Sequence, residues 1–146
     1  MGNLKIVLII LFLVAISFMI EEHYTPKVML GKTVVAVELA TTQQQWETGL
    51  MWRSYLGPHN GMLFIFDEEQ YLNYWMKNMK IQLDVIFIAP NMAIVDIKHD
   101  FQPCKSEPCE VYTPSKPYVY VLEVNANFTI NHNINIGDKI AFKNVY

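Results

Sequence analysis

Four charged side chains stand inside or beside apolar segments of the sequence, where a charge is costly unless it is paired. They are Arg53, Lys77, Asp84 and Glu123. Lys77 and Asp84 are seven residues apart across an expected turn, so a hairpin would place their side chains together. Two cations and two carboxylates in one place would form a ligand site, with a lysine or a carboxylate tuned for acid–base chemistry. A structural network of ion pairs at the mouth of a barrel also explains these residues.

Neighbouring side chains extend this candidate ligand site. Trp75 and Asn78 flank Lys77, and we include both with the four charged residues as candidate ligand-binding residues. The other large rings in this part of the chain are Trp46, Trp52, Tyr71 and Tyr74. Such rings would stack on sugars or on a peptide, or would fill the core and its rim. Asp84 and Glu123 would also suit the two carboxylates of a glycosidase, but the sequence does not give their separation.

The two cysteines, Cys104 and Cys109, lie in a proline-rich stretch and are expected to form a disulfide. A redox-active pair would have the Cys-x-x-Cys spacing, which the sequence lacks. A zinc site would recruit His99, but no third or fourth ligand is apparent, and no metal site is expected. The sequence also lacks a phosphate loop and a dinucleotide-binding fingerprint, so no cofactor is expected and no catalytic residue is assigned.

The first twenty residues have the character of a membrane-targeting segment. Lys5 precedes fifteen largely apolar residues, 6–20, and two glutamates follow them. This run is short for a spanning helix, which needs about 17–25 residues, and it fits the apolar region of a signal peptide. A cleaved signal peptide and an uncleaved anchor, holding the chain to the membrane through residues 4–20, both remain open. In either case the charge asymmetry predicts an extracytoplasmic location for the rest of the chain.

The remainder divides into a linker over residues 21–27 and one domain over residues 28–146. A domain of this length can bury a substantial core. Once Lys5 is set aside with the leader, fourteen acidic side chains outnumber ten basic ones. Nothing resembles the basic stripe that attracts phosphate backbones, so nucleic-acid binding is not expected.

Apolar residues in the domain recur with the two-residue period of strands or form short apolar runs. Strands are expected at 33–40, 62–66, 71–77, 83–89, 92–98, 118–124 and 139–145, with a turn at 67–69 and one helical turn within 125–135. A short helix is expected over 41–49, because Thr42 and Gln45 have the spacing of a capping box. Trp46 would point inward from this helix. About seven strands predict a mainly β fold, a small antiparallel barrel or sandwich with one or two short helices, preceded by an N-terminal hydrophobic helix.

Seven short strings occur in a fixed order along the domain. They are GLMWR (49–53), GMLFIF (61–66), YWMKN (74–78), LDVIFI (83–88), PCKSEPC (103–109), YVLEV (120–124) and IGDKI (136–140). Together they resemble the DUF192 family, also known as uncharacterised protein family 127. The resemblance covers residues 34–141 and implies a compact β-rich fold, common in exported or anchored prokaryotic proteins, without an established reaction. The sequence departs from the family at Trp52, where Phe is usual, and at Met79, where Thr is common.

These observations favour an exported module of the cell envelope that binds a small ligand, a glycan or a peptide. A small hydrolase that uses Lys77, Asp84 and Glu123 is the alternative. An accessory protein-interaction module, whose aromatic surface meets a partner, is the third interpretation.

The charge asymmetry around residues 6–20 predicts that the C-terminus lies outside the cytoplasm. A reporter enzyme that is active only in an oxidising compartment, fused after Tyr146, should therefore be active in cells. The same reporter without residues 1–20 serves as the control and should be inactive. Activity of a cytoplasm-dependent reporter at the same position would contradict export.

Overall fold

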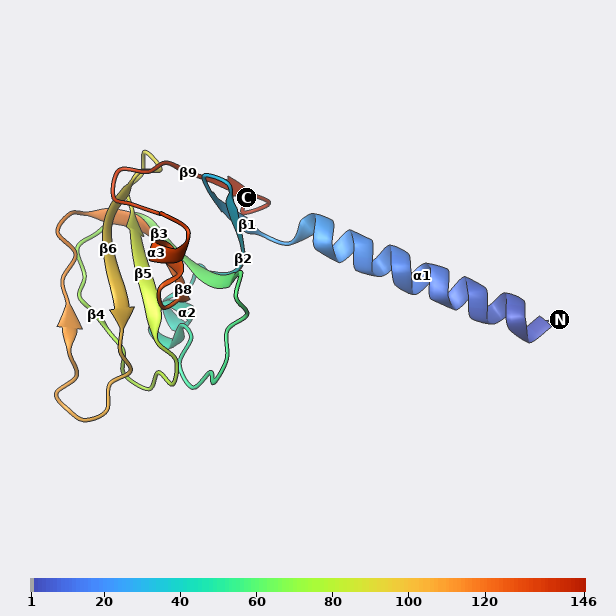
Figure 1. Cartoon of the computed structure of the whole chain (residues 1–146), viewed down its shortest axis with the longest axis horizontal. Helices are drawn as coiled ribbons and strands as arrows, with labels where there is room; N and C mark the ends of the chain where they lie inside the picture. The colour runs from blue at the N-terminus through green and yellow to red at the C-terminus, as the bar shows by residue number, and fades with distance from the viewer. Residues whose placement is uncertain (1) are drawn as a thin grey trace.

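A long N-terminal helix and a β domain follow each other along the chain. The computed structural model describes the backbone of residues 2–146 and the side chains of residues 4–17 and 24–146. Helix α1 (Gly2–Tyr24) extends away from the β domain (Figure 1). It runs through part of the expected linker, and β1 already begins at Lys27, so residues 25–26 alone connect the two parts. Within the described residues, no helix combines the length and the apolar character needed to cross a bilayer.

Residues 27–143 contain nine strands and two short helices. These are β1 (Lys27–Leu30), β2 (Thr33–Ala40), α2 (Gln43–Thr48), β3 (Asn60–Gln70), β4 (Tyr74–Trp75), β5 (Leu83–Ile88), β6 (Ile94–Phe101), β7 (Val111–Tyr112), β8 (Tyr118–Asn125), α3 (Phe128–Asn131) and β9 (Ile140–Lys143). Seven strands form one sheet in the order β6-β5-β8-β3-β2-β1-β9, and β4 pairs with β7 separately. The prediction of a mainly β fold with one or two short helices in the domain is confirmed, with nine strands in place of about seven.

One pair of neighbouring strands in the described sheet, β2 and β3, is parallel, with Val37 opposite Gly61. The chain leaves β2, passes through α2 and a loop, and returns to the starting end of β2 before it enters β3. Parallel neighbours require such a crossover, whereas antiparallel ones need only a tight turn. The expected antiparallel arrangement is therefore wrong at this pair, because the connection contains a helix.

The edges of the seven-stranded sheet meet at one end, so the sheet curls into a half-barrel (Figure 1). Ala93 and Lys139, which stand just before the edge strands β6 and β9, form an antiparallel bridge. The backbone N–H of Ile94 donates to the carbonyl of Asp138 at 2.9 Å. The expected barrel is thus present as a curled sheet whose edges are joined through a few residues.

The central strands of the sheet separate two apolar cores. Val35, Leu63 and Leu122 lie in the core enclosed by the half-barrel. Phe64 and Val121 lie in a second core on the outer face, covered by α2 and by the β4–β7 pair. Successive side chains of a strand point to opposite faces, so a strand between two cores is apolar at nearly every position. Strand β5, in which every residue is buried, has this pattern.

Two expected elements on the outer face have different bounds in the structure. Strand β3 continues through residues 67–69, expected as a turn, and still pairs with β8 at Gln70 after a bulge. Residues 71–77, expected as a strand, contain the two-residue strand β4, in which Tyr74 pairs with Tyr112 of β7. The segment after β3 therefore leaves the main sheet and crosses its outer face.

Gly61 lies where β3 packs against β8 without room for a side chain. A Cβ atom at this position would lie 2.5 Å from the backbone carbonyl oxygen of Glu123 and 3.2 Å from Cγ1 of Val35. The substitution Gly61→Ala should therefore push two central strands apart and lower the free energy of unfolding by about 3 kcal/mol. Denaturant unfolding of the full chain measures this loss.

Gly31→Ala provides the matched control. Gly31 has a φ of +61°, but no atom lies within 4 Å of an added Cβ. The control should cost only about 1 kcal/mol, the penalty for placing a side chain in a left-handed conformation. Equal losses for the two variants would show that the sheet accommodates a side chain at Gly61.

Candidate functional site

A cavity of about 390 Å³ lies on the outer face of the sheet, between α2 and residues 72–79. Its walls are mostly apolar and aromatic, and its polar lining includes Glu123 of β8. The apolar lining includes Trp46, Leu50, Phe64, Phe66, Tyr74 and Met76. A concave, largely apolar cavity with few polar groups is the usual form of a small-molecule site.

Local structure in α2 fixes one wall of this cavity. The predicted capping box is confirmed, since the N–H of Gln45 donates to Thr42 Oγ1 and Gln45 Oε1 accepts from the N–H of Thr42. Trp46 points inward as predicted: its ring packs on Phe66 with centroids 4.9 Å apart. Its indole Nε1–H donates to the carbonyl of Ala40 at 2.9 Å. These contacts tie α2 to the end of β2 and to the middle of β3.

Gly49 allows the chain after α2 to pass close to the sheet. Its φ is +47°, and an added Cβ would lie 3.1 Å from Phe64 Cζ and 3.9 Å from Glu123 Oε2. A side chain here would be strained by the backbone conformation and crowded against the cavity lining. Gly49 therefore brings backbone close to the carboxyl group.

Glu123 is the buried polar group of the cavity. The residue is 8% exposed, and its Oε2 atom has no hydrogen-bond partner among the described residues. Burial raises the pKa of Glu123 to about 8. The side chain is therefore mostly protonated and neutral at pH 7. Burial also raises the pKa of Tyr74, with further contributions from Tyr118 and from Glu123.

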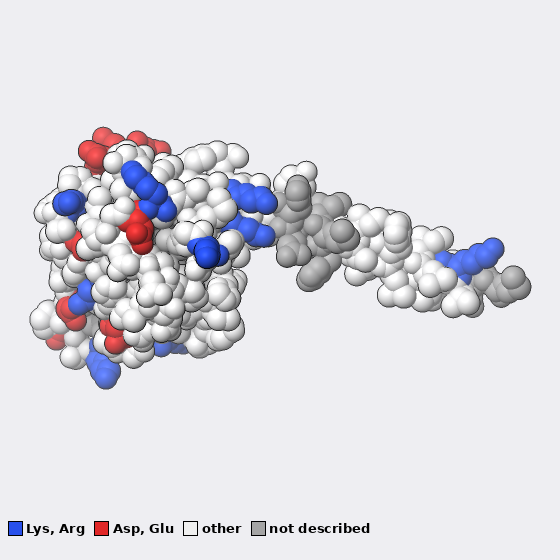
Figure 2. Space-filling view, turned by 45° about the horizontal axis from the view of Figure 1, so that its top comes forward, with Lys and Arg blue, Asp and Glu red and all other residues white. Residues whose placement is uncertain are grey.

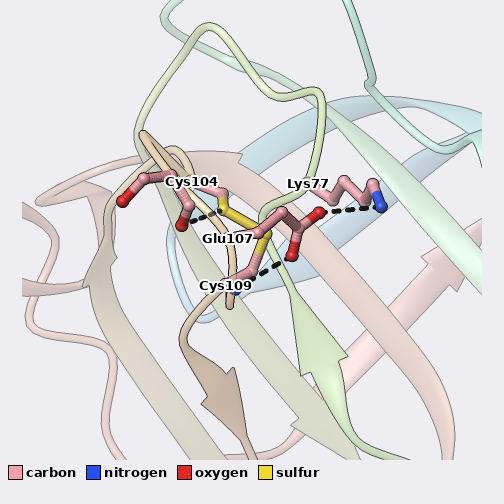
Figure 3. The surroundings of a disulfide bond; sticks show 5 residues. Lys77, Cys104, Glu107 and Cys109 are labelled. Carbon is pink, nitrogen blue, oxygen red and sulfur yellow. Dashed lines mark hydrogen bonds and ion pairs between the residues drawn. A yellow bond between two sulfur atoms is a disulfide. The ribbon is translucent and has the colours of Figure 1, made fainter.

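Lys77 lies at the rim of the same cavity but is engaged outside it. Its Nζ atom forms an ion pair with Glu107 at 2.8 Å (Figure 3) and lies 5.3 Å from the centroid of the Trp75 ring. The hydrogen bond from Lys77 lowers the pKa of Glu107. Trp75 is half exposed at the rim. The described ion pairs of Lys77 thus include neither Asp84 nor Glu123.

The predicted disulfide between Cys104 and Cys109 is present, with the two Cα atoms 5.3 Å apart. It closes the loop that carries Glu107, and the backbone N–H of Cys109 donates to Glu107 Oε2 at 3.3 Å (Figure 3). The loop therefore holds the carboxylate that binds Lys77. Among the described residues, no group of three His, Cys, Asp or Glu side chains is placed to hold a metal ion.

Asp84 lies on the other face of the sheet. It pairs in register with Val124, whereas Glu123 pairs with Val85, so the two carboxyl groups point into different cores. Asp84 accepts hydrogen bonds from the backbone N–H groups of Asp100, Asn127 and Thr129 and from the hydroxyl of Thr129. These bonds attach the end of β6 and the start of α3 to β5, which is a structural role.

Arg53 and Asn78 also lie outside the cavity lining. Arg53 forms a two-pronged ion pair with Glu38 of β2, and this pair lowers the pKa of Glu38. The carbonyl of Asn78 accepts from the N–H of Trp52 at 2.9 Å. Both residues fix the turn that follows α2 rather than the cavity itself.

Of the six candidate ligand-binding residues, the structure therefore brings three together at the cavity. These are Trp75, Lys77 and Glu123, whereas Arg53, Asn78 and Asp84 do not line it. Trp46 and Tyr74, which were expected either to stack on a ligand or to fill the core, also line the cavity, whereas its methionine and phenylalanine walls were not anticipated. Of these walls, Met51, Phe64, Phe66 and Met76 lie in the strings at 49–53, 61–66 and 74–78, whereas Met79 lies outside them, and Glu123 lies in the string at 120–124. The strings that resemble the family were the signal in the sequence that could have identified these lining residues.

Charged side chains on the surface have no single sign. Figure 2 shows Lys and Arg side chains scattered among acidic ones on the visible face of the β domain, with a group of acidic side chains at its upper edge. Such a face provides no continuous basic track along which a phosphate backbone would bind.

Comparison with known proteins places this fold in a family. The chain is similar to the structure of a protein from Sinorhizobium meliloti 1021, to which the role of a transcription regulator has been provisionally ascribed. That match has 33% identity and a TM-score of 0.72, over 80% of this chain and 91% of the other. A protein of unknown function from Novosphingobium aromaticivorans DSM 12444 matches with 29% identity and a TM-score of 0.72, over 80% and 83% of the two chains.

No curated protein matches the chain significantly. Residues 27–142 match DUF192, a family described as an uncharacterised ACR. This range runs from the start of β1 into β9 and contains every described residue that lines the cavity. The chain therefore belongs to the DUF192 family.

Proposed function

We propose that the β domain is a binding module whose ligand inserts an apolar body into the cavity between α2 and residues 72–79. The polar end of the ligand meets the carboxyl group of Glu123. The observation that carries this proposal is that Glu123 Oε2 is buried against the cavity and has no hydrogen-bond partner among the described residues. The cavity volume of about 390 Å³ suits a small molecule or one residue of a larger chain.

Stability alone gives no reason for a glutamate at this position. Its strand neighbours Val121, Leu122 and Val124 are fully buried and apolar. A buried polar group without a partner costs about 1–3 kcal/mol, whereas an apolar side chain of similar size would cost nothing of this kind. A carboxyl group retained against this cost is best explained by a partner that is not part of the chain.

Binding fits the geometry better than hydrolysis. The hydrolase interpretation requires Lys77, Asp84 and Glu123 to act on one substrate, but Asp84 points into the other core and Lys77 is bound to Glu107. A glycosidase needs two carboxyl groups that face the same bond. The cavity lining offers Glu123 and the exposed Glu47 of α2, and neither has a hydrogen-bonded base or nucleophile beside it among the contacts described.

The proposal includes a location outside the cytoplasm, as part of the cell envelope or secreted. Its support is the order of Lys5, the apolar residues 6–20 and the two glutamates that follow. A glycan or a peptide presented in that compartment would reach the cavity through its exposed rim, where Thr48 and Trp75 lie. The interaction-module interpretation would instead use this rim as a surface and leave the cavity empty.

A probe-binding experiment tests whether the cavity takes a ligand. The neutral fluorophore 1-aminoanthracene has an apolar body and an amine that can donate to Glu123, so its fluorescence should rise saturably when the full chain is added. Thr48→Trp places a large ring at the cavity rim and should weaken this binding at least tenfold. Equal binding by this variant would contradict the proposed site.

Gln44→Trp is the matched control for that experiment. Gln44 lies on the same helix, α2, is exposed and does not line the cavity. The control adds the same ring to the same element, so it should bind the probe as the unmodified chain does. Loss of binding in both variants would indicate a general effect of α2 on the fold, and the cavity would then not be the site.

A second prediction concerns the effect of pH on stability. Folded Glu123 keeps its proton up to about pH 8, while the unfolded side chain releases it near 4.5. The raised pKa means that the folded state is favoured at low pH and loses stability as pH rises between these values. Between pH 5 and pH 8 the loss from this group should be about 3 to 4 kcal/mol.

Glu123→Gln keeps the shape of the side chain and removes its titration, so the variant should lack this component of the pH dependence. Urea unfolding at pH 5 and pH 8 gives the change in the free energy of unfolding with pH for each protein. The difference between the two changes isolates the contribution of Glu123, because the other titrating groups contribute equally to both proteins. The same pH dependence in both proteins would mean that Glu123 is hydrated or paired.

A further inference from the structure

We infer that the ligand presents an organic ammonium group, which enters the cavity and forms an ion pair with Glu123 between aromatic walls. This inference rests on the proposed binding function and names the chemical class of the ligand. It concerns the end of the ligand that reaches the carboxyl group, and a primary or a methylated ammonium group on a peptide, a glycan or a free metabolite would share this chemistry.

Glu123 lacks a counter-charge among the described residues. Glu123 takes part in none of the described ion pairs, and it is more than nine-tenths buried. The cation in the cavity lining, Lys77, is bound at 2.8 Å to Glu107 on the outer side of the rim. A buried carboxylate is stable only with a cation or several donors close to it. A ligand with a cationic group would supply the counter-charge that the described residues do not provide.

The walls of the cavity are suited to a cation. Trp46, Phe64 and Tyr74 line the cavity together with the thioethers of Met51 and Met76. The faces of aromatic rings carry negative charge and attract cations within about 6 Å, most strongly where water is excluded. Methionine sulfur is polarizable and adapts to irregular shapes. Aromatic walls around one carboxyl group are the usual chemistry of ammonium recognition.

The rim already shows such a contact. The ammonium group of Lys77 lies 5.3 Å from the centroid of the Trp75 ring, and both residues line the cavity. Trp75 as a whole is half exposed, so part of this residue is accessible to a cation that enters from solvent. A ligand ammonium group would therefore pass an aromatic face before it reaches Glu123.

The charges around the cavity favour a cation over an anion. The titratable groups in the lining are Glu47 on α2, Tyr74 and Lys77 in residues 72–79, and Glu123 on β8. Tyr118 lies behind Tyr74, with ring centroids 6.0 Å apart, and is neutral in the physiological range because burial raises its pKa. The charge of Lys77 is balanced by Glu107. Ionisation of Glu123 thus leaves a negative site, which attracts cations and repels anions.

Binding of an ammonium ligand is coupled to release of a proton, so the affinity must change with pH in a definite direction. An ammonium ligand binds ionised Glu123, so binding must release the proton that the free protein holds below about pH 8. Affinity for such a ligand should rise about 50-fold between pH 6 and pH 8. A neutral ligand that accepts a hydrogen bond from protonated Glu123 would show the opposite trend, with affinity falling slightly over the same range.

Benzylammonium and benzyl alcohol form a matched pair of probes, alike in shape and different in charge. Calorimetric titration of the full chain at pH 6, 7 and 8 should give benzylammonium binding that strengthens about 50-fold, with a proton released on binding. Glu123→Gln should weaken benzylammonium binding at pH 8 at least tenfold and remove its pH dependence. Glu69→Gln, which removes an exposed carboxylate outside the cavity lining, should change neither.

Three results would overturn the inference. Benzylammonium affinity that is the same at pH 6 and pH 8 would show that Glu123 is not the counter-charge. This measurement uses only the unmodified chain, so it does not depend on whether a variant folds. Retention of affinity in Glu123→Gln would lead to the same conclusion. Binding of benzyl alcohol without benzylammonium would point to a neutral ligand, and the 1-aminoanthracene experiment would then still support the binding function. Failure of that experiment as well would remove both proposals.

Discussion

Burial of both faces of the central strands is the constraint on which the rest of the structure depends. All residues of β5 are buried, and β8 directs Leu122 and Val124 into the half-barrel and Val121 and Glu123 into the outer core. Such strands have no solvated face, so each polar side chain on them needs protein donors, a ligand or a proton. The register of β5 against β8 therefore decides which core receives each carboxyl group.

Asp84 and Glu123 meet this constraint in different ways. Asp84 is surrounded by donors, because the end of β6 and the start of α3 turn backbone N–H groups toward it. Glu123 faces a cavity lined largely by aromatic and apolar side chains, and a Cβ added at Gly49 would lie 3.9 Å from its Oε2 atom. A burial-raised pKa is the expected response of a carboxyl group without donors. The contrast therefore arises from the layers that cover the sheet, since the two residues occupy adjacent places within it.

Local patterns predicted much of the fold, and pairing over long distances explains where they failed. The capping box at Thr42 and the disulfide depend on residues close in sequence, and both are present. The parallel pairing of β2 with β3 depends on a crossover whose path no local pattern contains. The site was predicted only in part, again because its arrangement depends on pairing between strands that are distant in sequence. Charges within apolar strings identified Glu123, but only the register of β5 with β8 shows that Asp84 faces elsewhere.

Protonation of Glu123 and the ion pair between Lys77 and Glu107 favour each other. An exposed ion pair such as that between Lys77 and Glu107 is weak, so a buried carboxylate nearby would compete for the lysine. Protonated Glu123 has no charge with which to compete, and Lys77 remains with Glu107 in the loop closed by Cys104 and Cys109. With Lys77 held outside, Glu123 in turn has no cation that would favour its ionisation. Each group therefore favours the observed state of the other, and an ammonium ligand that enters the cavity would displace the proton of Glu123 without breaking the ion pair between Lys77 and Glu107.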